Sequence, residues 1–239
     1  MSNNNSQNII ILKKMESKLS ANLKQCLEKE DLENFNDVEV KARAFAVLGQ
    51  ILNESEGLSP HQKEIIPTFD EIFSDIIISL YFAACSLDNP AQIILRRVLE
   101  LGVAIVYLWD YPIAFWGWKN HDKDLKFNEM IEYLASDTYK TFIQSINQNH
   151  NNEYGLLIQD ARNSYRRFSN TLHGKIVTFE STLTDRFTYN SEDWHSYISL
   201  VKKVQEVLLN MYGTRFYECF TELYQRLPSL SRSDGEGAL

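Results

Sequence analysis

Glycine and proline are scarce in this sequence, with 9 and 5 occurrences in 239 residues. Because these residues interrupt helices and mark tight turns, their scarcity argues against a fold built from many short strands and loops. The long intervals between them carry apolar residues at three- and four-residue spacing, which is typical of helices. The sequence therefore predicts an all-α fold, a multi-helix bundle.

Cysteine is rarer still, with only Cys26, Cys85 and Cys219. Their odd number and wide spacing exclude a disulfide framework and predict reduced thiols in the core. The dispersed histidines lack the paired spacing of metal ligands: His61, His121, His150 and His195. We expect surface or helix-capping roles for them and no metal site. The sequence also lacks a phosphate-cradling glycine loop and a nucleophile elbow, so no cofactor is expected.

Basic residues are fewer than acidic ones, 24 against 32, which gives a formal net charge of -8. The surface as a whole cannot attract nucleic acid, so any RNA contact must be local. Long apolar runs and a secretory signal are lacking as well, which predicts a cytoplasmic protein without a membrane span. The aromatic segment 109–118 is expected to form a packed turn, in the core or at a dimer contact; a membrane-interface or base-stacking role is the alternative.

The apolar periodicity predicts one helical domain over residues 1–230, in which residues 1–56 could form an N-terminal extension, followed by a flexible tail, 231–239. The first helix is expected to place Ile11, Met15, Leu19, Leu23 and Leu27 or Cys26 on one stripe. The expected helices are 9–29, 36–53, 70–87, 91–109, 126–135, 137–147, 154–172 and 192–227.

Capping residues and breaks mark several boundaries. Ser59 and Ser136 are predicted helix caps, and Pro60 and Pro90 suit the first turn of a helix. The last helix could kink near Gly213. The remaining segments are expected to be an exposed loop, 147–152, a weakly extended run to residue 186, and a polar tail from residue 228.

One helix carries the most informative polar pattern. Arg162, Arg166, Ser169 and His173 follow steps of four, three and four residues, so all four project from one face, with Tyr165 beside them. Arginine is a fixed multi-donor cation, and histidine exchanges a proton near neutral pH. Because a helix is expected to stop directly after His173, its C-terminus would favour the imidazolium form. This strip could hold a phosphate group.

A second polar pair lies in an apolar helix. Arg96 and Glu100 are one turn apart among aliphatic residues, so both charges are expected to be partly buried and to need partners. From an adjacent helix the pair could brace Tyr165, Ser169 and His173.

These two segments carry a resemblance to known proteins. Residues 94–100 read Ile-Leu-Arg-Arg-Val-Leu-Glu and are followed by Val-Tyr-Leu at 106–108; residues 165–174 read Tyr-Arg-Arg-Phe-Ser-Asn-Thr-Leu-His-Gly. They resemble the paired motifs of uncharacterised bacterial proteins that are similar to the HEPN (higher eukaryotes and prokaryotes nucleotide-binding) helical class, over residues 91–174.

The resemblance implies a component of a bacterial anti-phage defence or toxin system, frequently a dimer, that cleaves RNA without a metal. It implies His173 as the residue that helps activate the ribose 2′-hydroxyl and Arg166 or Arg167 as the group that stabilises the phosphate. Arg162, Tyr165, Ser169, Arg96 and Glu100 would support them. Two alternatives stay open: a non-catalytic helical module that binds or regulates a partner protein, and a sensor that binds a phosphorylated ligand without chemistry.

Overall fold

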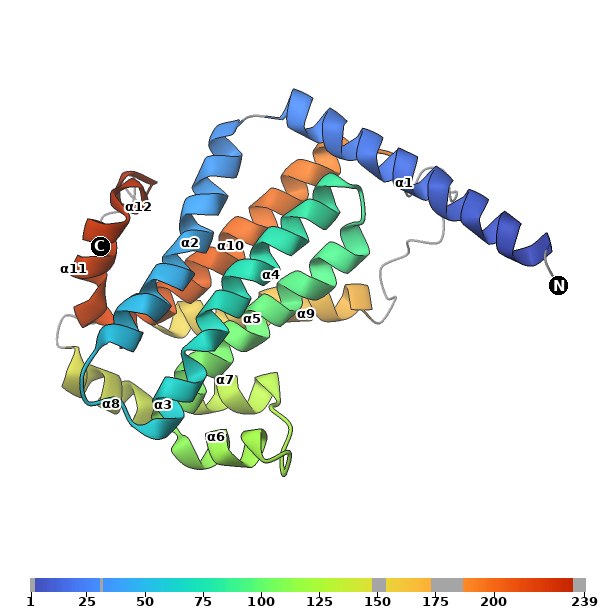
Figure 1. The fold of residues 1–239 in the computed structure, drawn as a ribbon. Helices are drawn as coiled ribbons and strands as arrows, with labels where there is room; N and C mark the ends of the chain where they lie inside the picture. Colours follow the sequence, from blue (N-terminus) through green and yellow to red (C-terminus); the bar gives the residue numbers. More distant parts are fainter. Residues whose placement is uncertain (1–2, 31, 148–153, 173–186, 234–239) are drawn as a thin grey trace.

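The computed structural model describes residues 3–30, 32–147, 154–172 and 187–233, and helices are the regular elements throughout these ranges (Figure 1). This confirms the predicted all-α multi-helix bundle. The helices are α1 (Asn3–Lys29), α2 (Leu32–Glu54), α3 (Pro60–Ile65), α4 (Pro67–Ala84), α5 (Asp88–Asp110), α6 (Pro112–Lys119), α7 (Phe127–Ala135), α8 (Asp137–Ile146), α9 (Tyr154–Leu172), α10 (Ser191–Arg215), α11 (Tyr217–Arg226) and α12 (Pro228–Ser233).

Four long helices form the centre of the bundle. The antiparallel hairpin of α4 and α5 packs against α2 and α10, and Figure 1 shows these helices side by side. Helix α9 crosses behind α5 and contacts both α5 and α10, while α7 lies against α5 and α9. The hairpin therefore positions α9 and α7 relative to each other.

Helices α5 and α10 approach each other closely at Gly102. A Cβ atom at this position would lie 2.5 Å from the Cδ1 and Cδ2 atoms of Leu208, which is fully buried in α10. One turn further along α10, the hydroxyl of Tyr212 donates a hydrogen bond of 3.1 Å to the carbonyl oxygen of Gly102. The absence of a side chain at residue 102 thus permits both contacts.

Several helix boundaries are those that the sequence predicted. Pro60 and Pro90 lie in first turns, and α9 has the predicted bounds. The hydroxyl of Ser136 accepts a hydrogen bond of 3.2 Å from the backbone N–H of Tyr139, as expected of a helix cap. At these positions, local capping residues were sufficient to predict the helix boundaries.

The expected single helix 192–227 is wrong. Helix α10 ends at Arg215 and α11 begins at Tyr217, so the break lies at Phe216 rather than near Gly213. Phe216 is 5% exposed, and its ring packs against aromatic side chains of α4 and α5. Burial of this ring redirects the chain, which the apolar periodicity of the segment does not reveal.

Two expected non-helical segments are helical. The aromatic segment 109–118 is not a turn, because α6 begins at Pro112 and buries Phe115. The expected polar tail from Pro228 begins with α12, and Leu230 is 1% exposed in a small apolar cluster with α2 and α11. In both cases proline occupies the first turn, where its missing N–H costs no helical hydrogen bond.

The bounds of α4 also differ from the expected 70–87. The helix begins at Pro67, and it ends at Ala84 because Ser86 adopts a left-handed backbone conformation with φ of 62°. In α1 the buried face carries Asn22 and Cys26, whereas Ile11, Met15 and Leu27 of the predicted apolar stripe are exposed. The predictions for 148–152, 173–186 and 234–239 concern residues outside the described ranges.

Candidate functional site

Tyr165 of α9 is contacted by two other helices. Its hydroxyl oxygen accepts a hydrogen bond of 2.7 Å from Nη2 of Arg96 in α5. Its ring stacks on Phe127 of α7, with ring centroids 4.0 Å apart and planes inclined by 3°. The guanidinium carbon of Arg96 lies 4.6 Å from the Tyr165 ring centroid. One side chain therefore joins α5, α7 and α9.

Arg96 also pairs with Glu100 one turn later in α5. Its Nε atom lies 3.0 Å from Oε1 of Glu100, and its side chain is only 16% exposed. The buried Nη1 atom has no hydrogen-bond partner within the described part of the chain. Because most of the guanidinium is covered, Arg96 braces α9 against α5 rather than presenting its charge to solvent.

The sequence pattern identified part of this contact and missed the rest. The spacing of Arg96 and Glu100 predicted their pairing and an adjacent helix carrying Tyr165, and the structure places the three together. The sequence pattern did not indicate the contact of Phe127 with Tyr165. Nor did it indicate the 2.9 Å hydrogen bond that the hydroxyl of Thr171 donates to the side-chain oxygen of Gln92 in α5. These partners are far apart in sequence and belong to no local period.

The outward face of α9 is basic. Arg162, Arg166 and Arg167 are exposed, whereas the opposite face of α9 is buried in the bundle and carries Ala161, Ser164 and Phe168. We call these three arginines the α9 arginine strip. Because the inner face packs on α5 and α7, the strip is held in one direction relative to the bundle.

The remaining predicted site residues are Ser169 and His173. Ser169 is half-buried in the last turn of α9. His173 directly follows the last residue of α9 and lies outside the described residues.

The α9 arginine strip differs from the other arginines in its charge balance. Other arginines with described side chains each have a carboxylate partner: Arg43, Arg96, Arg97, Arg215 and Arg226. No described carboxylate pairs with an arginine of the strip. In a chain of net charge -8, three exposed guanidinium groups on one helix without a described carboxylate partner form a local cationic surface.

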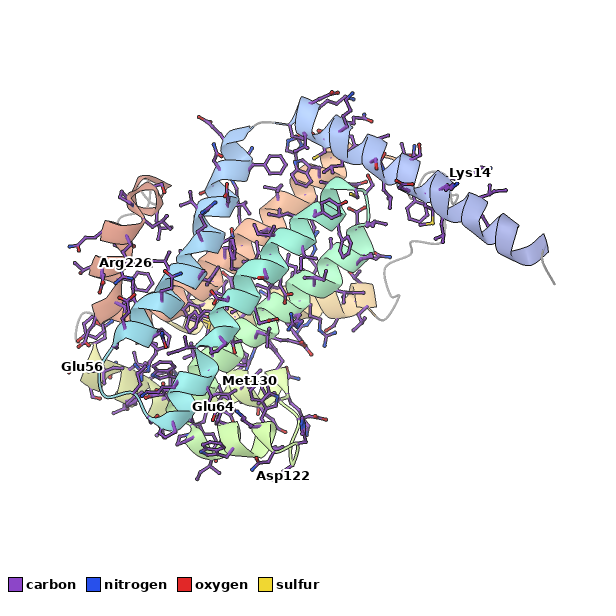
Figure 2. The ribbon with its side chains drawn as sticks, in the orientation of Figure 1. Lys14, Glu56, Glu64, Asp122, Met130 and Arg226 are labelled. Atoms are coloured by element: carbon purple, nitrogen blue, oxygen red, sulfur yellow. The ribbon has the colours of Figure 1, made fainter. Side chains whose placement is uncertain are left out.

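A hollow of ≈ 240 Å³ lies between the C-terminal part of α5, α6 and the start of α7. Its walls include Tyr107, Tyr111 and Met130, and Lys126 and Glu129 lie at its polar edge. Figure 2 labels Met130 on α7, above the segment that joins α6 to α7. Lys126 directly precedes Phe127, so the hollow adjoins the contact between α7 and α9.

Two histidines that we expected at the surface take part in buried contacts. His61 is 9% exposed, and its Nε2 atom lies 3.1 Å from the carbonyl oxygen of Trp109. His195 lies at the surface, but its Nε2 atom is 2.9 Å from Oε2 of Glu30, whose side chain is 4% exposed. These contacts join distant segments, so the sequence could not indicate them.

Glu30 is the centre of a polar cluster that fastens α1 to α10. Burial acts to raise the pKa of the Glu30 carboxyl, but hydrogen bonds from Ser191 and Tyr189 and the nearby His195 outweigh it and hold the pKa below its usual range. The nearby Cys26 thiol has its pKa raised to about 12, mainly by burial. Neither group is therefore poised for proton transfer near neutral pH.

Comparison with protein-family models, with curated proteins and with solved structures finds no match to this chain. Within the described ranges there is no group of three side chains that could hold a metal ion. No helix in the same ranges is long and apolar enough to cross a bilayer.

Proposed function

We propose that the chain binds RNA along the α9 arginine strip and cleaves it without a metal, with His173 as the proton-transfer residue. The observation that carries this proposal is that no described carboxylate pairs with Arg162, Arg166 or Arg167, whereas the other arginines with described side chains have such partners. An exposed guanidinium without an internal partner remains available to a phosphate oxygen. The overall negative charge restricts such binding to local basic surfaces such as this one.

The proposed reaction uses the RNA strand as its own nucleophile. His173, or a water that it orients, removes the proton of a ribose 2′-hydroxyl, and the 2′-oxygen attacks the adjacent phosphorus. The bond from phosphorus to the 5′-oxygen breaks, and that oxygen takes up a proton, which leaves a 2′,3′-cyclic phosphate and a 5′-hydroxyl. Arg166 or Arg167 stabilises the charge on the phosphate oxygens in the transition state.

The hydrogen bond from Arg96, which also pairs with Glu100, to Tyr165 supports the proposal because it fixes the orientation of α9. Stabilisation by positioned groups depends on their geometry, so a helix that presents Arg166 and Arg167 to a phosphate must not rotate. The resemblance of residues 94–100 and 165–174 to HEPN-like proteins adds a role in a bacterial defence or toxin system to the proposal.

The test is incubation of the purified protein with total RNA in the presence of a chelator. We expect discrete fragments with cyclic phosphate ends from the wild type and none from His173→Asn, with equal helical content and melting temperature. His121→Asn is the matched control, since this exposed residue has a φ of 61°, which asparagine tolerates. A wild type that cleaves no RNA, or a His173→Asn variant that cleaves as fast, would contradict the proposal.

Helix α1 favours a second candidate function, association with a partner protein. Met15 and Ile11 precede the buried Asn22 by 7 and 11 residues, so they continue the face of α1 that packs on the bundle. Figure 1 shows that this part of α1 extends beyond the bundle, and both side chains are exposed there. A flat bilayer could not reach this face beside the bundle, whereas a second globular body could.

The chain itself offers a surface that could occupy this position. The outer face of the α4–α5 hairpin exposes apolar side chains: Ile77, Ile78, Tyr81 and Ile93. Exposed apolar surfaces of this kind mark interaction sites, and two of them on one chain suit a two-fold dimer. The partner in this proposal is a second copy, with α1 of each copy on the hairpin of the other.

Sedimentation equilibrium tests this association. We expect a dimer for the wild type and a monomer for the Ile11→Glu, Met15→Glu double variant. The control, Ser17→Glu with Ala21→Glu, adds the same charges to other exposed positions of α1 and should remain dimeric. A monomeric wild type would contradict the proposal.

A further inference from the structure

The hollow between α5, α6 and α7 is lined by a tyrosine whose hydroxyl has no partner among the described residues. Tyr107 is 8% exposed and lines the hollow, yet its hydroxyl makes no hydrogen bond with any described residue. Burial, with smaller effects from Tyr111, Glu129 and Tyr133, raises the pKa of Tyr107, so the hydroxyl stays protonated and able to donate. Because the hydroxyl oxygen keeps access to solvent while the rest of the side chain is buried, it is free to donate a hydrogen bond to a ligand in the hollow.

The aromatic wall of the hollow is preformed. The rings of Tyr107 and Tyr111 have centroids 5.6 Å apart, and Tyr133 contacts both rings at 5.1 and 5.5 Å. These mutual contacts hold the two lining rings before any ligand binds. Because the planes of Tyr107 and Tyr111 are inclined by 80°, a flat ring can stack on one of them while the other meets its edge.

The opposite edge of the hollow is polar. Glu129 lies 3.1 Å from Nζ of Lys123 and 3.0 Å from Nζ of Lys126, and all three residues line the hollow. This edge therefore offers two hydrogen-bond donors, the ammonium groups of Lys123 and Lys126, and one acceptor, the carboxylate of Glu129. The Tyr107 hydroxyl is a further hydrogen-bonding group in the hollow. This combination fits a flat ring that carries both donors and acceptors on its edge.

We propose that this hollow binds one nucleobase, stacked on Tyr111 with its polar edge toward Tyr107 and Glu129. The volume of ≈ 240 Å³ is below the range of about 300–1,000 Å³ typical of drug-sized ligands, which suits a single base. A phenylalanine side chain of a peptide could stack in the same way but would leave the Tyr107 hydroxyl without a partner.

The inference deepens the proposed function and rests on it for the origin of the base. Tyr107 and Arg96 are separated by 11 residues of α5, or about 16 Å along its axis. Phe127, next to Lys126 of the hollow, stacks on Tyr165 of α9. A strand bound to the α9 arginine strip could therefore place one base in the hollow a few nucleotides away.

The test uses the four ribonucleosides, because they carry a base but no phosphate and so do not depend on the arginine strip. Titration calorimetry with the full chain should detect binding of at least one of them. We expect Tyr107→Phe to weaken it about five- to tenfold, since one hydrogen bond is lost. Tyr133→Phe is the matched control, because Tyr133 belongs to the same ring cluster but does not line the hollow.

A second variant blocks the hollow without altering a packed contact. Gly117 lines the hollow, and a Cβ atom added there would have no neighbour within 4 Å, so Gly117→Leu should fold and abolish nucleoside binding. A single-stranded RNA titrated in parallel tells the two sources of the base apart: Gly117→Leu weakens RNA binding if the base comes from RNA and leaves it unchanged if free nucleosides are the ligands.

Failure of this inference is distinguishable from failure of the proposed function. If no nucleoside binds the wild type, or if Tyr107→Phe and Gly117→Leu bind as well as the wild type, the hollow is not a base site, whatever the RNA cleavage assay gives. If nucleosides bind as expected but the wild type cleaves no RNA, the base site stands and the proposed cleavage is wrong.

Discussion

Arg96 and Tyr165 are 69 residues apart in the sequence and joined by a hydrogen bond of 2.7 Å between α5 and α9. Because the same tyrosine ring stacks on Phe127, the contact ties α7 to the pair as well. The orientation of the α9 arginine strip therefore depends on a side chain at its inner edge.

Replacing Tyr165 with phenylalanine should destabilise the fold while leaving the stacked ring in place. The change removes the acceptor of Nη2 in a guanidinium whose Nη1 atom already lacks a partner. Leaving a buried donor unsatisfied costs about 1–3 kcal/mol of the free energy of unfolding, measurable by urea denaturation. The control is Tyr217→Phe, which removes an exposed hydroxyl that donates a hydrogen bond to Glu218. It should change the free energy of unfolding by less than about 0.5 kcal/mol. Equal stability of Tyr165→Phe and the wild type would show that the hydrogen bond contributes nothing.

Neutralising the α9 arginine strip should change the salt dependence of RNA binding as well as its strength. Each phosphate contact contributes about 0.7 to the slope of log K against log salt concentration for a single strand. The triple variant Arg162→Gln, Arg166→Gln, Arg167→Gln should therefore lose up to about 2 from that slope, measured by fluorescence anisotropy.

The matched control for this measurement is Lys13→Gln, Lys14→Gln, Lys18→Gln, which removes the same charge from exposed positions of α1. We expect its slope to equal that of the wild type. If both triple variants lower the slope equally, binding follows total charge, and α9 has no special role.

Much of the fold could be predicted because helices are local structures. Periodicity and capping residues such as Ser136 gave α9 its bounds and α8 its start, and the one-turn spacing of Arg96 and Glu100 gave their pairing. The break at Phe216 and the stacking of Phe127 on Tyr165 depend on side chains brought together by tertiary packing, which leaves no periodic signal. That no described carboxylate pairs with the α9 arginine strip was equally hidden, since pairing depends on where the acidic side chains lie in space.

The pH dependence of stability should contain a contribution from Asp88, the first residue of α5. Burial, reinforced by the carboxylate of Asp193, raises the pKa of Asp88 from 3.8 to about 6. The stabilising contribution of the protonated carboxyl is fully present below the unfolded pKa and is lost as the pH rises through the folded pKa. Between pH 4 and pH 7 the wild type should therefore lose up to about 2–3 kcal/mol from this group.

Asp88→Asn removes this loss, so its advantage over the wild type should grow from pH 4 to pH 7 in urea denaturation. The advantage is reduced by about 0.3–1 kcal/mol because a carboxylate favours a helix N-terminus. Asp137→Asn, at the exposed first residue of α8, should show no such growth. A difference between Asp88→Asn and the wild type that is independent of pH would contradict the shifted pKa.

The close approach of α5 and α10 makes Gly102→Ala a test of the central packing. The added methyl group would lie 2.5 Å from both terminal carbons of Leu208, which is fully buried and cannot move freely. Overpacking of this kind costs about 1–3 kcal/mol, partly offset by about 0.5–1 kcal/mol from the better helix propensity of alanine. Gly117→Ala in α6, where the methyl group meets nothing within 4 Å, should show only the gain of about 0.5–1 kcal/mol from helix propensity.

Because Leu208→Val shortens the clashing side chain, the double variant Gly102→Ala, Leu208→Val should be more stable than the sum of the single changes predicts. Additive changes in the free energy of unfolding would show that the two residues do not meet.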